Sequence, residues 1–106
     1  MEMANYIFSI LRSNRMVMWS WGFHQAKALP NNAGLAFKVS GFKHKGWVKV
    51  VYHEGKDLFV VILLDNQDNE IERIEDVYFD SLVDVIDEAV ERTSDYSERI
   101  KQFYNN

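Results

Sequence analysis

Residues 35–64 contain three strand-like segments separated by two short turns, and this pattern limits the fold more than any other feature. Apolar side chains recur at every second position in three segments: 35–42, 46–54 and 57–64. The turns at 43–46 and 54–57 each contain a glycine, which supplies the positive φ that tight hairpin connections usually need. Strands joined by hairpins run antiparallel, so we expect an antiparallel meander.

The last of these segments is apolar on both of its faces. Leu58, Val60, Ile62 and Leu64 share one face, and Phe59, Val61 and Leu63 share the other. A strand that is apolar on both faces needs cover on both sides of its sheet. Either helices pack on opposite faces of the sheet, or one face meets a second copy or a ligand.

The flanking sequence adds helices and further strands. Residues 4–15 have the three- and four-residue apolar spacing of an amphipathic helix. Large apolar side chains recur at every second position over 16–24, which predicts a strand with an aromatic face. The proline and the Asn-Asn-Ala-Gly cluster within 25–34 predict a loop, and a fifth strand is expected over 70–75.

The carboxyl-terminal part predicts a long helix over residues 81–104, capped by Asp80 or Ser81 and either unbroken or divided at Ser94. The predicted fold class is therefore α+β, with an N-terminal helix, a four- to five-stranded antiparallel meander sheet and a long C-terminal helix. With 106 residues, the chain fits a single compact domain over 1–106.

Composition limits the compartment. The sequence contains no cysteine, which removes disulfides and thiolate chemistry and fits a cytoplasmic location. The N-terminal residues lack a basic leader, so we expect no signal peptide. The longest apolar run has seven residues where a membrane span needs about twenty, so we expect no membrane partner.

Charge is divided along the chain. Residues 1–56 carry eight lysines or arginines and two acidic residues, whereas residues 57–106 carry four and fourteen. The division falls inside a predicted hairpin turn, so it does not mark a domain boundary. We interpret it as two poles of one domain, which can orient a partner or a second copy.

Catalytic and metal-binding patterns are not evident in the sequence. It has neither a nucleophile elbow nor a glycine-rich phosphate loop. His44 and His53 would lie about 30 Å apart along one strand. His24 and His53 could approach each other, but the sequence has no HxH or HExxH spacing that would support a metal site there. The carboxylates between 84 and 91 read as the solvated face of a helix. We therefore expect no catalytic residue, metal or cofactor, and a chain that is not an enzyme.

Two sets of residues are candidates for binding. The first is a basic and aromatic set for a nucleic-acid or protein partner: Lys43, Lys45, Trp47 and Lys49. The second is a set for an apolar pocket or interface: Trp19, Trp21, His24, Phe59 and Val61. The favoured hypothesis is a non-enzymatic interaction module that self-associates through a sheet face or binds another protein. The alternative is binding of single-stranded nucleic acid through the basic and aromatic hairpin surface.

Three segments, 11–24, 42–48 and 77–80, together resemble a group of small uncharacterised bacterial proteins. The resemblance extends over most of the chain and implies a compact α+β domain. It implies no activity, cofactor or site residue.

Overall fold

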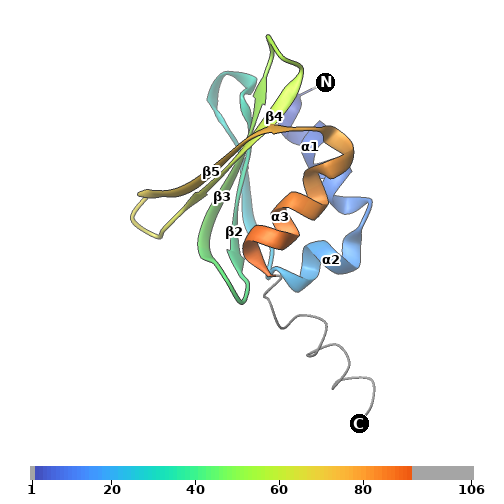
Figure 1. The fold of residues 1–106 in the computed structure, drawn as a ribbon. Helices are drawn as coiled ribbons and strands as arrows, with labels where there is room; N and C mark the ends of the chain where they lie inside the picture. Colours follow the sequence, from blue (N-terminus) through green and yellow to red (C-terminus); the bar gives the residue numbers. More distant parts are fainter. Residues whose placement is uncertain (1, 92–106) are drawn as a thin grey trace.

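A computed structural model describes residues 2–91, and within them three helices accompany five strands (Figure 1). The helices are α1 (Met3–Arg12), α2 (Arg15–Ser20) and α3 (Leu82–Val90). The strands are β1 (His24–Ala28), β2 (Gly34–Ser40), β3 (Lys45–His53), β4 (Leu58–Leu64) and β5 (Glu70–Val77). Short 3-10 turns cover Pro30–Asn32 and Phe79–Ser81.

The strands form one sheet in the order β1-β2-β3-β4-β5, and every neighbouring pair is antiparallel. The predicted meander and the α+β class are thus confirmed. In the central pairing, Trp47 lies opposite Leu64 and Val50 lies opposite Val61. This register sends the side chains of alternate residues to the same face across β2, β3 and β4.

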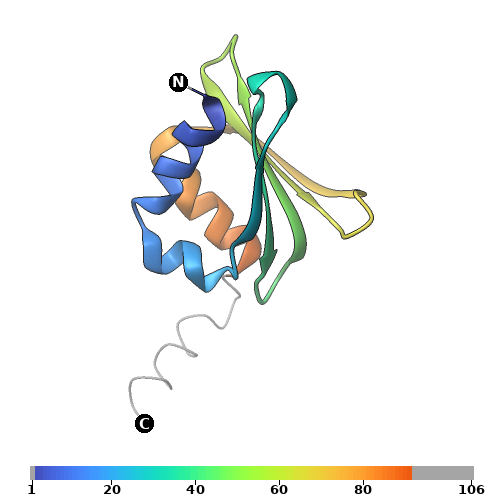
Figure 2. The ribbon, with the colours of Figure 1, turned by 180° about the vertical axis from the view of Figure 1, so that it is seen from behind.

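All three helices pack against the same face of the sheet (Figures 1 and 2). The large apolar residues that α1 and α3 bury follow a four-residue spacing: Ile7, Leu11, Leu82, Ile86 and Val90. They meet Phe37, Val50 and Val61 from the strands in one core. Burying a side chain of this size contributes about 1.5–3 kcal/mol. Of the arrangements expected for the doubly apolar strand, helices on opposite faces of the sheet are therefore not found among residues 2–91.

The prediction for residues 16–34 was partly wrong. The segment expected to be a strand contains α2, and the segment expected to be a loop contains most of β1. Met18 and Trp21 are both buried three residues apart, which is a helical spacing hidden within the alternation. β1 has five exposed residues, so it lacks the alternating burial pattern that reveals a strand in a sequence.

The helix predicted over 81–104 is described only in its first part. α3 begins at Leu82 with Ser81 as its N-cap residue, although the Ser81 side chain makes no capping hydrogen bond. Residues 92–106 lie outside the described residues, and with them the expected division at Ser94. None of the helices in the described part is long and apolar enough to cross a membrane.

Candidate interaction surface

The face of the sheet opposite the helices, here called the open face, has an apolar centre. Val60, Ile62 and Leu64 of β4 form a cluster there with Trp47 and Val51 of β3. These five residues are the open-face cluster. The three β4 side chains are 6–8% exposed because long side chains of neighbouring strands flank them. Antiparallel sheets that leave one face in water usually place polar residues there, and β4 departs from this rule.

Lysines border the open-face cluster on the side of β1 and β2. In the sheet register Lys38 lies opposite Trp47, and Lys49 lies opposite Ala36. The Nζ atoms of Lys27 and Lys38 lie 4.7 and 5.6 Å from the centre of the Trp47 ring. Such cation–π contacts contribute about 0.5–1 kcal/mol each at exposed sites. The open-face lysines, here called the lysine flank, are Lys27, Lys38, Lys45 and Lys49.

On the other side, β5 presents a net acidic border. Glu70 lies opposite Leu64 and Arg73 lies opposite Ile62, so both point to the open face. Strand alternation places Glu75 on the same face as Arg73. Arg73 Nη2 donates to Glu70 Oε1 at 2.8 Å, and this bond lowers the pKa of Glu70. We call Glu70, Arg73 and Glu75 the β5 flank; one of its two carboxylates is already paired with the arginine.

A hollow of about 330 Å³ lies within the open face. Ala36 contributes to its lining and is fully buried, and its small side chain leaves room between Lys27 and Lys49. Trp47 and Asp68 also line the hollow. The surface therefore combines an apolar stripe, a concave region and charges of both signs.

Of the predicted basic and aromatic set, Lys45, Trp47 and Lys49 lie on the open face, whereas Lys43 does not. Lys43 instead contacts the C-terminal end of α3: its Nζ donates to Glu88 O at 2.7 Å, and its backbone N–H donates to Val90 O at 2.9 Å. Lys27 and Lys38 also lie on the open face and were not predicted as binding residues. Alternation along β2 identifies Lys38 once β2 is paired with β3, but Lys27 lies in a segment that reads as a loop.

The predicted apolar set is not a common surface, which corrects that prediction. Trp21, Phe59 and Val61 are 0–3% exposed and belong to the core between helices and sheet. Trp19 is 69% exposed on α2, and His24 is exposed on β1. The three core residues are unavailable to a partner because the helices already cover their face of the sheet.

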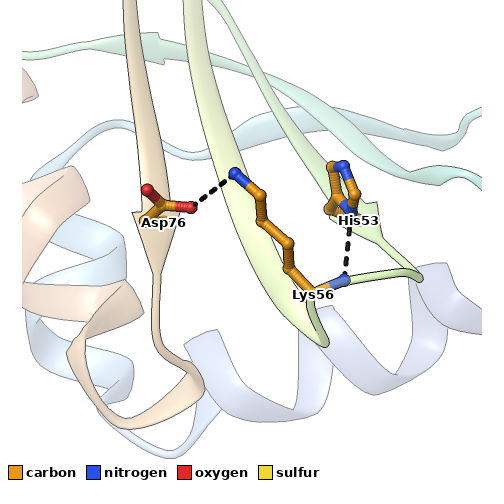
Figure 3. A network of polar contacts seen from close by, with 3 residues as sticks. All are labelled: His53, Lys56 and Asp76. Atoms are coloured by element: carbon orange, nitrogen blue, oxygen red, sulfur yellow. Dashed lines mark hydrogen bonds and ion pairs between the residues drawn. The ribbon is translucent and has the colours of Figure 1, made fainter.

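The histidines lie apart and have structural contacts. His44 is buried, and its Nε2 lies 3.1 Å from Trp47 O. His53 Nδ1 accepts the backbone N–H of Lys56 at 3.2 Å, and the Lys56 ammonium pairs with Asp76 of β5 at 3.2 Å (Figure 3). These contacts fix the β3–β4 turn against β5. Across residues 2–91, no three histidine, aspartate or glutamate side chains are placed to hold a metal ion together.

A second hollow, of about 540 Å³, lies on the helical side between α1 and the start of α3. Tyr6, Ile10, Phe79 and Val83 give it apolar walls, and Asp80 and Asp84 give it acidic ones. None of the residues predicted to be functional lines it.

In comparisons with known proteins, no family model, no curated protein and no solved structure matches this chain.

Proposed function

We propose that this chain is a non-enzymatic interaction module that self-associates through the open face of its sheet. The observation that carries the proposal is the open-face cluster: five apolar side chains on the face that no helix of the described residues covers. Protein interfaces commonly have an apolar centre and a polar rim. The open-face cluster and its two charged flanks have this composition.

The cluster favours a modest affinity. Its β4 side chains are only 6–8% exposed before any association, so they have little apolar area left to bury. Most of the apolar area that a dimer would bury therefore comes from half-buried Trp47 and Val51 and from the aliphatic parts of the lysines. Apolar burial contributes about 25 cal/mol for each Å² removed from water. We therefore expect an equilibrium between monomer and dimer that depends on protein concentration.

Sedimentation velocity over the micromolar concentration range tests the proposal. We expect the average mass of the wild type to rise with concentration. The variant Ile62→Lys places an ammonium at the centre of the cluster and is expected to remain monomeric. Met16→Lys is the matched control, because Met16 is 82% exposed and lies on α2, on the helical side of the sheet.

Circular dichroism confirms that each variant is folded, and Ile62→Thr repeats the test without adding charge. A folded wild type that stays monomeric at every concentration would refute the proposal. So would an Ile62→Lys variant that associates as strongly as the wild type.

Binding of single-stranded nucleic acid is the second candidate, and the lysine flank around Trp47 favours it. It ranks second because, in the strands of residues 2–91, Trp47 is the one phenylalanine, tyrosine or tryptophan on the open face, and two lysines already lie near its ring. Sheets that bind single strands commonly stack two or three bases on aromatic side chains. The β5 flank would also repel phosphates.

This candidate predicts binding to mixed oligonucleotides at low salt. If four lysines neutralise four phosphates, log affinity falls with log salt at a slope of about −3. Lys27→Gln with Lys38→Gln should reduce that slope, whereas Arg15→Gln on the helical side should not. Absence of binding at low salt excludes the candidate.

A further inference from the structure

Charge changes sign across the open face in the direction perpendicular to the strands. The lysine flank occupies β1, β2 and β3, where Lys49 lies opposite Ile62; the uncharged stripe follows β4, and the β5 flank is net acidic. One register row makes the order plain. It runs from Lys38 on β2 through Trp47 on β3 and Leu64 on β4 to Glu70 on β5.

A symmetric dimer that packs open face against open face has two simple choices of axis. In both, the same patch of each copy forms the contact. An axis in the interface plane and perpendicular to the strands places each strand over its own counterpart, so that lysines face lysines. An axis parallel to the strands reverses the strand order, so that the lysine flank of each copy faces the β5 flank of the other.

The position of the open-face cluster determines where the axis parallel to the strands crosses the face. Its five residues come from β3 and β4, so an axis through its centre runs between these two strands. Rotation about that axis brings β2 of one copy over β5 of the other and keeps each register row at its own height. Lys38 then lies over Glu70 of the second copy, and Trp47 lies over Leu64 of the second copy.

The sheet edges offer a poorer contact. The β1–β2 pairing has a register irregularity, and the β4–β5 pairing has two. Asp68, in the turn before β5, and Asp76, within β5, also have positive φ. Bulges and charged residues at sheet edges oppose strand-to-strand pairing between molecules.

The size of the face agrees with a weak dimer. Five strands about 4.8 Å apart and seven residues of about 3.3 Å each outline a face of about 24 by 23 Å. Stable interfaces bury about 800 Å² on each partner. The face, with a flat area of about 550 Å², is therefore smaller than a standard interface, and in so small a contact charge complementarity decides the orientation.

We infer that two copies pack open face against open face about a two-fold axis parallel to their strands, with Lys38 of each copy paired with Glu70 of the other. This inference rests on the proposed self-association and adds its geometry. It also makes the contact sensitive to ionic strength: added salt weakens this dimer, whereas it would strengthen a dimer in which lysines face lysines.

Charge reversal at these two positions tests the geometry in the full-length chain. Lys38→Glu alone and Glu70→Lys alone each place like charges together twice in the dimer. We expect each substitution to raise the dissociation constant of the dimer about tenfold, equivalent to about 1.4 kcal/mol of lost binding free energy. The chain that carries both substitutions restores opposite charges across the interface and should recover most of the wild-type affinity.

The controls carry the same charge changes on the other side of the sheet. They are Glu72→Lys and Arg15→Glu. Glu72 lies on β5 opposite the core residue Leu63, and Arg15 lies on α2. Both should leave the dissociation constant within about twofold of wild type, because surface charges farther away than about 10 Å are largely screened at 0.1 M salt.

The outcomes separate this inference from the proposed function. Self-association that Ile62→Lys abolishes, but that the combined variant does not recover, overturns the geometry and leaves the proposed function standing. An association that strengthens with salt also overturns the geometry alone. A wild type that remains monomeric overturns both.

Discussion

Trp19 and Trp21 show how two identical side chains two positions apart take opposite environments. Trp21 is fully buried, and its Nε1–H donates to Asp87 Oδ1 at 3.0 Å, whereas Trp19 is 69% exposed. On a strand they would share a face. Near the end of a helix, two positions correspond to a rotation of about 200°, which separates them. The alternating pattern therefore predicted one aromatic face where the structure has one core residue and one surface residue.

Replacing Trp21 by Phe should destabilise the fold by about 2 kcal/mol. The change removes a donor to the buried Asp87 carboxylate and part of the ring volume in the core. Urea denaturation gives the free energy of unfolding. Trp19→Phe is the matched control and should change it by about 0.5 kcal/mol or less. Equal effects of the two substitutions would contradict the role of the buried ring.

Asp65 makes the β4–β5 turn sensitive to acid. Its carboxylate accepts hydrogen bonds from Asn69 and from the Gln67 N–H, and the bonds from Asn69 are the main cause of its lowered pKa. Because its pKa is lower in the folded state, the ionised Asp65 stabilises the folded turn at pH values above the unfolded pKa of about 3.9. That contribution is lost as pH falls through the still lower folded pKa.

We therefore expect the Asn69 and Gln67 amide signals to titrate at a pH below that of an ordinary aspartate. An NMR pH titration of the wild type measures this. Asp65→Asn should remove the titration from these amides while leaving the sheet intact. A midpoint at or above the usual aspartate value would contradict the assignment.

At the scale of elements, the β2–β3 turn is hydrogen-bonded to the C-terminal end of α3. Phe42 N–H donates to Glu91 Oε2 at 3.1 Å, and Lys43 donates to two backbone carbonyls near the end of α3. The two Lys43 bonds satisfy carbonyls of the kind that a helix end leaves without intrahelical partners. Lys43 was predicted as a binding residue because it is basic and near Trp47 in sequence. Only the path of α3 across the sheet reveals its structural contact.

Gly41 is expected to be intolerant of a side chain in this turn. A Cβ atom at this position would lie 2.3 Å from Val90 O and 2.5 Å from Val90 Cγ1, which forces the turn and α3 apart. Gly41→Ala should lower the free energy of unfolding by about 1–3 kcal/mol. Gly55→Ala in the β3–β4 turn is the control, because its nearest contact is the His53 ring at 3.3 Å. Similar stabilities of the two variants in urea denaturation would contradict the close packing.

At the scale of the whole molecule, the two layers formed by residues 2–91 leave one sheet face without a helix, and the division of charge extends across that face. The sequence division at residue 56 suggested a basic and an acidic pole. In the fold, basic residues from β1 to β3 and acidic residues from β5 border the same apolar stripe. Charge therefore varies within one candidate interface as well as between the two halves of the chain.

If the folded dimer is populated, the melting temperature should rise with protein concentration. For unfolding enthalpies near 0.7 kcal/mol per residue, mass action predicts about 3 °C for each tenfold increase. Differential scanning calorimetry at several concentrations measures the slope. Ile62→Lys should show none, and a wild type without a slope would contradict coupled folding and association.

Local periodicity predicted the strands β2, β3 and β4 and the two apolar faces of β4, because alternation follows from backbone geometry, but it missed β1. The same periodicity predicted that both faces of β4 need cover. Tertiary structure alone decided which face the helices cover, because that choice depends on contacts between residues far apart in the chain. It likewise brought Lys27 and Lys38 beside Trp47, since the neighbours of a side chain on a sheet follow from strand register.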